Sequence, residues 1–260
     1  MFGGDDGFTF FQNMFALNLE TLEWRKIEPK HTILEDGSKV HVFPKGRSGA
    51  TLVPFDNRLF LFGGDNNNEA EKQFNDLYYY DSIENVWIKP AVSGTPPRPR
   101  EGHSAVSLID PSSNNKKQML VFGGHCCQSK DVYFSDIHVL DVNTMAWSTL
   151  SNDSRDLTDK TFEGILSYPL ERTNHSAAIL EGQNKMVVFG GRRGKRCFSD
   201  IYVLDLNNLK WFEPLTTGQQ PTPREGCTMD CIGQKLIIFG GNQQWPVYYN
   251  DTYVCDIGNL

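Results

Sequence analysis

The 260-residue sequence has no apolar run near the ~18 residues that a membrane-spanning helix requires. Its first residues also lack the basic and apolar stretches of a secretory signal peptide. Positive charge is not in excess, because 25 Lys and Arg stand against 32 Asp and Glu. The formal net charge of −7 argues against the broad basic surface that nucleic-acid binding requires. These absences predict a cytoplasmic protein with no membrane or nucleic-acid partner.

Cysteine is too sparse for a disulfide framework. The six cysteines stand at positions 126, 127, 197, 227, 231 and 255. Without a secretory signal, we expect them to be reduced thiols. His125, Cys126, Cys127 and Cys197 could suggest a metal site, but adjacent cysteines do not supply the usual Cys-x2–4-Cys spacing of zinc ligands. We therefore predict no metal and no cofactor.

Glycine and aromatic residues are plentiful, and they recur in register. The triplet Phe-Gly-Gly occupies positions 2–4, 62–64, 122–124, 189–191 and 239–241. A pair of Asp or Asn residues five apart follows each triplet: 13/18, 76/81, 136/141, 200/205 and 251/256. In four repeats a tryptophan comes six residues after the second member, at Trp24, Trp87, Trp147 and Trp211. Such coupled spacings indicate a repeat architecture.

Each repeat reads as four short strands. An arginine precedes strand 1, the Phe-Gly-Gly triplet ends strand 2, the Asx pair brackets strand 3, and the tryptophan lies on strand 4. We expect the second Asx to bond its own backbone and begin a tight 3–4 turn. One such sheet cannot bury its faces alone, whereas several arranged radially can.

This motif set resembles the kelch repeat, in which each unit forms one blade of a β-propeller. The resemblance covers essentially the whole chain and implies an all-β kelch β-propeller of four-stranded antiparallel blades. We predict a single propeller region over 1–260, with blades at about 47–90, 100–150 and 172–214 and partial blades at 1–24 and 224–260. Six-bladed rings are common in this family, so three full and two partial blades predict a fragment of a larger ring. Further blades or domains of the same protein are then expected partners.

Long, variable loops between strands 2 and 3 and between successive blades are predicted to share one face, where recognition usually resides. Two of these loops differ sharply in chemistry. Arg192, Arg193, Lys195 and Arg196 form a basic cluster, and the loop at 243–249 carries Trp245 and Tyr248. A basic cluster beside an aromatic loop could clamp an acidic peptide, or both could simply be surface residues.

The four repeated arginines are the remaining binding candidates: Arg47, Arg100, Arg172 and Arg224. In some kelch proteins that look similar, arginine at this position binds acidic peptides. In others it pairs with structural carboxylates, a role that the adjacent Glu101 and Glu225 favour here. His103 and His175 recur at equivalent positions, so we expect packed fold residues and not catalysts.

The sequence contains no coherent catalytic set. We therefore predict a non-catalytic interaction module that presents its loops to a protein or peptide, possibly acidic. The alternative is a metal-dependent enzyme propeller, either iron lyase-like or copper oxidase-like. The iron-dependent relatives carry a Glu-x3-Asp-x3-His triplet, of which only Glu171 and His175 match a fragment here.

Overall fold

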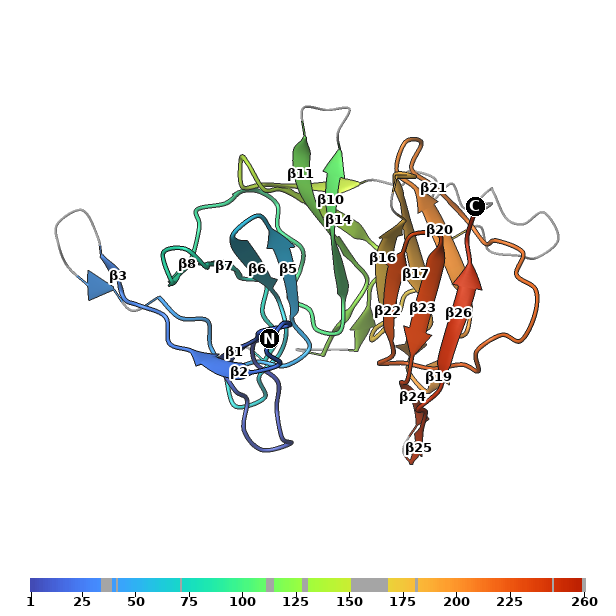
Figure 1. Cartoon of the computed structure of the whole chain (residues 1–260), viewed down its shortest axis with the longest axis horizontal. Coiled ribbons are helices and arrows are strands. Elements are labelled where there is room, and N and C mark those ends of the chain that lie inside the picture. Colours follow the sequence, from blue (N-terminus) through green and yellow to red (C-terminus); the bar gives the residue numbers. More distant parts are fainter. Residues whose placement is uncertain are drawn as a thin grey trace.

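The computed structural model describes residues 1–33, 39–40, 42–70, 72–110, 115–127, 131–150, 168–180, 182–244 and 246–258. Within these residues every regular element is a β-strand, arranged in successive antiparallel sheets (Figure 1). The prediction of an all-β propeller is confirmed. That the chain is part of a larger ring stays a prediction.

The first two sheets hold two and four strands. β1 (Met14–Leu17) pairs with β2 (Trp24–Ile27) to form the first sheet. The second sheet follows chain order through β5 (Thr51–Phe55), β6 (Arg58–Phe62), β7 (Leu77–Asp81) and β8 (Val86–Ile88). A short pair, β3 (Thr32–Ile33) and β4 (Lys39–Val40), lies between them in sequence.

The third and fourth sheets repeat the four-stranded plan. The third contains β10 (Ser104–Asp110), β11 (Lys116–Phe122), β14 (Ile137–Asp141) and β15 (Ala146–Leu150). β9 (Ser93–Gly94), from the loop before this sheet, adds to it in parallel beside β15. The fourth sheet contains β16 (Ser176–Leu180), β17 (Lys185–Phe189), β20 (Ile201–Asp205) and β21 (Lys210–Phe212).

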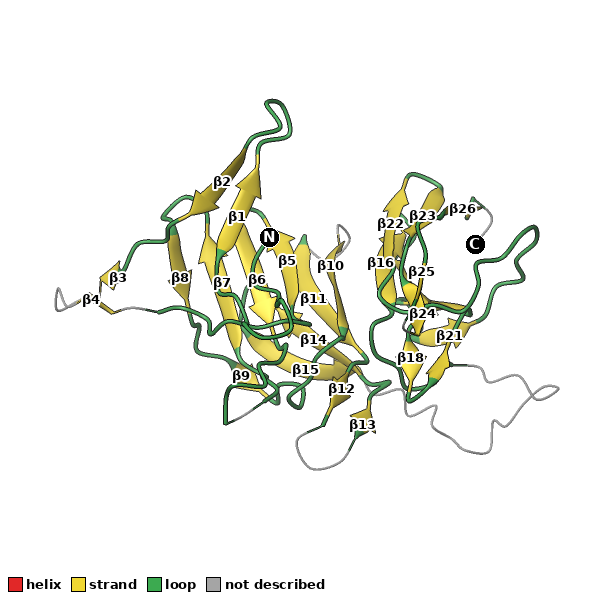
Figure 2. Ribbon diagram, turned by 90° about the horizontal axis from the view of Figure 1, so that it is seen from below, coloured by secondary structure: helices red, strands yellow, loops and turns green. Residues whose placement is uncertain are grey.

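The fifth sheet has three strands among the described residues: β22 (Thr228–Ile232), β23 (Lys235–Phe239) and β26 (Thr252–Asp256). The first strands of the second to fifth sheets contact one another in order, β5 with β10, β10 with β16 and β16 with β22. Strand 1 of the second to fifth sheets is therefore the inner strand, and strand 4 of the second to fourth sheets lies on the outside (Figure 2).

Each loop from strand 2 to strand 3 in the last three sheets forms a small hairpin of its own. These hairpins are β12 (His125–Cys126) with β13 (Val132–Tyr133), β18 (Arg192–Arg193) with β19 (Arg196–Cys197), and β24 (Asn242–Gln244) with β25 (Val247–Tyr248). In Figure 1, β24 and β25 project below the fifth sheet. The sequence patterns did not predict these hairpins, because none exceeds three residues a strand.

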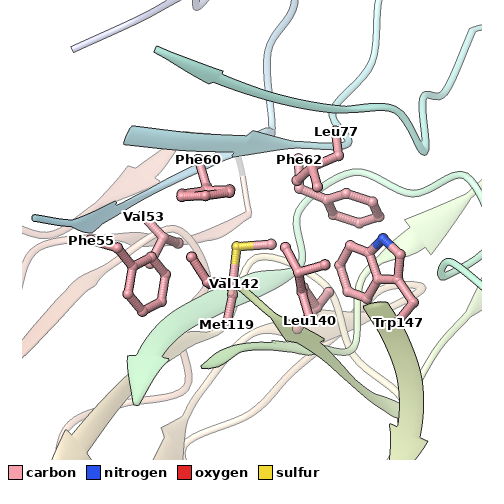
Figure 3. Packing of buried hydrophobic residues seen from close by; sticks show 10 residues of the cluster. Val53, Phe55, Phe60, Phe62, Leu77, Met119, Leu140, Val142 and Trp147 are labelled. Carbon is pink, nitrogen blue, oxygen red and sulfur yellow. The ribbon is translucent and has the colours of Figure 1, made fainter. Parts of the chain in front are cut away.

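The hydrophobic cores lie between sheets. Between the second and third sheets, Phe62 meets Trp147 with ring centroids 5.1 Å apart, beside Met119 and Leu140 (Figure 3). The next interface repeats this contact, with Phe122 and Trp211 at 5.4 Å. The phenylalanines of the first three Phe-Gly-Gly triplets thus each pack against the tryptophan of the following sheet, and the burial of two large aromatic surfaces stabilises each contact.

The glycine pairs are required by this close stacking. Gly63 has φ +64°, and a Cβ there would lie 2.8 Å from the carbonyl oxygen of Arg100 in the next sheet. The following residue, Gly64, donates its N–H to the same carbonyl at 2.9 Å. A side chain would therefore break both the backbone conformation and the inter-sheet contact.

Candidate partner-binding site

The repeated arginines lie inside the sheets. The side chains of Arg47, Arg100, Arg172 and Arg224 are all fully buried. In each, Nη1 donates to the carbonyl of the first glycine of the same repeat and the two Nη atoms form a fork with the first Asx of the pair. The partner carboxylates are Asp76, Asp136, Asp200 and Asp251.

An aromatic ring completes each arginine's surroundings. For Arg100, Nη1 reaches Asp136 Oδ1 at 2.7 Å, and the guanidinium lies 4.2 Å from the ring centroid of Phe134. Burial alone would raise the pKa of Asp136, but hydrogen bonds from His138 and Arg100 hold it well below the usual range. Arg100, just before strand 1, therefore links the end of strand 2 to the start of strand 3.

The sequence named Glu101 and Glu225 as candidate carboxylates for these arginines. The structure places both elsewhere: Glu101 Oε1 lies 3.2 Å from His125 Nδ1, and Glu225 Oε2 accepts from Arg192 Nε at 2.6 Å. The invariant spacing of the Asx pair was the available signal for the true partners.

His103 and His175 join neighbouring sheets. His103 Nε2 lies 2.9 Å from Thr51 Oγ1, and His175 Nε2 lies 2.9 Å from Ser104 Oγ. Each imidazole packs edge-on against the preceding triplet's phenylalanine, Phe62 or Phe122. Burial lowers the pKa of His103 to about 3 and that of His175 well below its usual value, so both are neutral.

The basic cluster lies on the β18–β19 hairpin, and two of its members are neutralised. Arg192 is half-buried and pairs with Glu225, while Arg193 Nη1 lies 3.1 Å from Glu171 Oε2. Lys195 and Arg196 are exposed, and no carboxylate of the described chain lies within ion-pair distance of either. The charge available to a partner is therefore concentrated on these last two residues.

The structure brings the basic and aromatic loops together. Gln244 Nε2 donates to the carbonyl of Lys195 at 2.5 Å, and Cys197 Sγ lies 3.5 Å from the carbonyl of Gln243. An open cavity of about 280 Å³ between the two hairpins is lined by Lys195, Cys197, Gln243, Gln244 and Val247. Tyr248 is 68% exposed beside it. Trp245, the other aromatic candidate, lies outside the described residues.

The β12–β13 hairpin, from the third sheet, borders the same face, but its charged neighbours are carboxylates. Its His125 is held between Glu101 and Asp131, with Nε2 3.4 Å from Asp131 Oδ1. The hydrogen bond to Glu101 raises the pKa of His125, despite partial burial. The cysteines of this hairpin contact Gln73, whose Nε2 donates to Cys127 Sγ at 3.0 Å. All six cysteines are free thiols. In the described part of the chain, no three His, Cys, Asp or Glu side chains lie close enough together to hold a metal ion.

Comparison with known proteins identifies the architecture. The KLHDC2/KLHL20/DRC7 Kelch-repeats domain model matches residues 1–165 and 160–260. The chain belongs to the kelch-repeat family. Proteins of this family are generally interaction domains without enzymatic activity, so the enzyme alternative is not favoured.

Several curated kelch relatives cover nearly the whole chain. Kelch domain-containing protein 3 of Rattus norvegicus is 28% identical over 291 residues, covering 94% of this chain and 73% of the relative. Host cell factor 2 of Homo sapiens is 27% identical, covering 98% of this chain and 33% of its own length. Acyl-CoA-binding domain-containing protein 5 of Arabidopsis thaliana is 29% identical, covering 93% of this chain. This chain spans only 34% of the length of that plant protein. It spans 32% of acyl-CoA-binding domain-containing protein 4 of the same plant.

These kelch domains indicate a protein-interaction module. In the described residues no helix is long and apolar enough to cross a membrane.

Proposed function

We propose that this kelch propeller binds an acidic peptide segment of a partner protein at the adjoining β18–β19 and β24–β25 hairpins. The observation that carries the proposal is the open cavity between them, with Lys195 on one side and the exposed Val247 and Tyr248 on the other. Arginine and lysine attract carboxylates, and an exposed tyrosine offers a large rigid contact surface.

The basic side chains have different roles in this proposal. Lys195 and Arg196 contact the peptide's carboxylates directly. Arg192 and Arg193 hold the hairpin in place through their ion pairs with Glu225 and Glu171. Arg47, Arg100, Arg172 and Arg224 are buried and maintain the sheets from which the hairpins project.

The test is a peptide array of acidic, neutral and basic sequences, each with and without an aromatic residue. We expect acidic–aromatic peptides to be enriched and their binding to weaken as salt rises, because exposed charges are screened. Lys195→Glu with Arg196→Glu should weaken binding roughly tenfold or more. Arg25→Glu with Lys26→Glu, an adjacent exposed pair on β2, is the matched control and should leave it unchanged.

Equal weakening by both double variants would mean that only net charge matters and would remove the hairpins as the site. Enrichment of neutral or basic peptides would overturn the acidic partner.

A further inference from the structure

Two hairpins of the chain have the same length and opposite charge. Both follow a Phe-Gly-Gly triplet and lead into strand 3 of their sheet, which places them on the same face of the propeller. In the fourth sheet Arg192 pairs with Cys197, and in the first sheet Asp5 pairs with Phe10. Where β18–β19 reads Arg-Arg-Gly-Lys-Arg-Cys, the first sheet reads Asp-Asp-Gly-Phe-Thr-Phe, and both glycines have positive φ. Residues 5–10 are called the acidic turn below.

The acidic turn is held in one conformation by its own carboxylates. Asp5 Oδ1 accepts from Gly7 N at 2.9 Å. Asp6 Oδ1 accepts from the N–H groups of Phe8 and Thr9 at 3.0 and 2.7 Å. The hydrogen bonds from Thr9 and Phe8 lower the pKa of Asp6, so its carboxylate is ionised. Within the described residues no cationic side chain forms an ion pair with either aspartate.

The tip of the acidic turn displays an aromatic ring. Phe8 is 87% exposed, and its carbonyl oxygen accepts from Asn68 Nδ2 at 3.3 Å, so a loop of the second sheet supports the turn. The corresponding residue of β18–β19 is Lys195, which is also exposed although neighbouring sheets flank the fourth sheet on both sides. Exposure of the tip is therefore a property of the hairpin itself.

The acidic turn has the chemistry that the basic hairpins require of a ligand. Their open cavity joins Lys195 to the loop that carries the exposed Tyr248, and Arg196 stands next to it in the chain. Residues 5–8 offer two carboxylates and one exposed phenyl ring in a preformed turn. Carboxylates pair with lysine and arginine, and a rigid aromatic side chain anchors such contacts.

The acidic turn and the basic hairpins do not meet within one chain. Asn68 ties the turn to the second sheet, whereas Gln244 ties β18–β19 to the fifth. The second and third sheets stand between them (Figure 1). A two-fold axis lying in this face, however, sets the acidic turn of each of two copies opposite the basic hairpins of the other. One arrangement of two copies thus makes two identical contacts.

We propose that the acidic turn of one copy of the chain binds the basic hairpins of a second copy. This contact rests on the hairpin site proposed above and makes the protein its own partner. The two symmetric contacts act together, because forming one raises the effective concentration of the groups that form the other. Both cavities are then occupied, so an acidic peptide from another protein has to compete with the dimer.

Sedimentation equilibrium of the full chain tests the dimer. We expect dimerisation that weakens as salt rises, because exposed charges are screened. Asp5→Asn with Asp6→Asn keeps an oxygen for the turn's hydrogen bonds but removes both charges, and it should weaken dimerisation roughly tenfold or more. Glu20→Gln with Glu23→Gln is the matched control. It removes the same charge from exposed residues of the 3–4 turn in the same sheet and should leave dimerisation unchanged.

The aromatic contact is tested separately. Phe8→Ala should weaken dimerisation roughly fivefold, since large aromatic side chains dominate such interfaces. Leu19→Ala, 80% exposed in the 3–4 turn of the same sheet, should have no effect.

Mixing two variants identifies which surfaces touch. Lys195→Glu with Arg196→Glu leaves the acidic turn intact, and Asp5→Asn with Asp6→Asn leaves the basic hairpins intact. Each variant alone has lost one side of both contacts, whereas the mixture retains one native turn facing one native cavity. With one variant labelled, we expect the mixed dimer to be roughly tenfold tighter than either variant with itself.

Three results would overturn the second copy as partner. A chain that stays monomeric at every concentration yet binds acidic–aromatic peptides would do so and would leave the hairpin site standing. Dimerisation that neither double variant weakens would place the contact elsewhere. A mixture that associates no better than its components would separate the turn from the hairpins. Failure of every acidic peptide, with dimerisation sensitive to both double variants, would instead overturn only the binding of other proteins' peptides.

Discussion

At the scale of single residues, the 3–4 turns hold an unexpected strain. The second Asx of each pair caps its turn as the sequence predicted: Asp141 Oδ1, for example, accepts from the N–H groups of Asn143 and Thr144 at 3.0 Å. Four residues after the second Asx, however, the chain adopts a left-handed conformation at Leu22, Asn85, Met145 and Leu209. Of these residue types only asparagine tolerates that conformation readily.

Leu22→Asn should therefore stabilise the protein. Leu22 is 71% exposed with φ +57°, and Asn85 already occupies the corresponding position. We expect the free energy of unfolding to rise by about 0.5–1 kcal/mol in urea titrations, because the left-handed strain is relieved. Leu19→Asn is the control, since Leu19 is 80% exposed in the same turn but has no positive φ. An equal gain at both sites would attribute the effect to surface polarity and not to strain.

At the scale of the elements, one arginine ties each repeat together. Its guanidinium joins the start of strand 1, the end of strand 2 and the start of strand 3 through two carbonyls and one carboxylate. For Arg172 these partners are Leu170 O, Gly190 O and Asp200. Removing the guanidinium leaves all three without their donor in a largely buried place.

Arg172→Met should lower the free energy of unfolding by about 3 kcal/mol, because removing one partner of a buried ion pair leaves the other charge without compensation. Arg196→Met, on the exposed hairpin of the same sheet, should change it by about 0.5 kcal/mol or less. Thermal and urea unfolding of the two variants give the comparison. Similar losses would contradict the division between structural and surface arginines.

At the scale of the whole molecule, neutral histidines link successive sheets, which makes stability depend on pH. His103 takes up its proton only near pH 3 when folded, and the pKa of His175 is also lowered by burial. Both titrate near 6.5 when unfolded. Below pH 6.5 the unfolded chain therefore binds more protons than the folded one, and stability falls as pH falls.

For His103 the slope approaches about 1.4 kcal/mol per pH unit well below pH 6.5. Across pH 6.5 to 5, His103 alone should remove about 1.5–2 kcal/mol of the free energy of unfolding, as measured by urea titration at each pH, and His175 acts in the same direction. The raised pKa of His125 acts with the opposite sign, and its contribution is lost as pH rises above about 6.5.

His103→Ala, which copies Ala50 at the corresponding position of the preceding repeat, should make this dependence on pH shallower. The slope is the informative readout, because lost packing lowers stability at every pH alike. An unchanged slope would remove His103 as a source of the acid sensitivity.

The sequence by itself determined the fold. Phe-Gly-Gly, the Asx pair and the tryptophan recur at fixed spacing because each sits at a fixed place in a four-stranded sheet, so local pattern sufficed to place the strands. It also predicted the capped turns and the packed roles of His103 and His175, which the contacts to Thr51 and Ser104 now explain.

Only the tertiary structure decided how the loops are used. Arg192 is neutralised by Glu225, and Lys195 lies against Gln244. Both contacts join residues more than 30 positions apart in the sequence. Repeat spacing specifies each sheet from within, whereas the surfaces that we propose to bind a partner arise between sheets, where the loop sequences follow no common pattern.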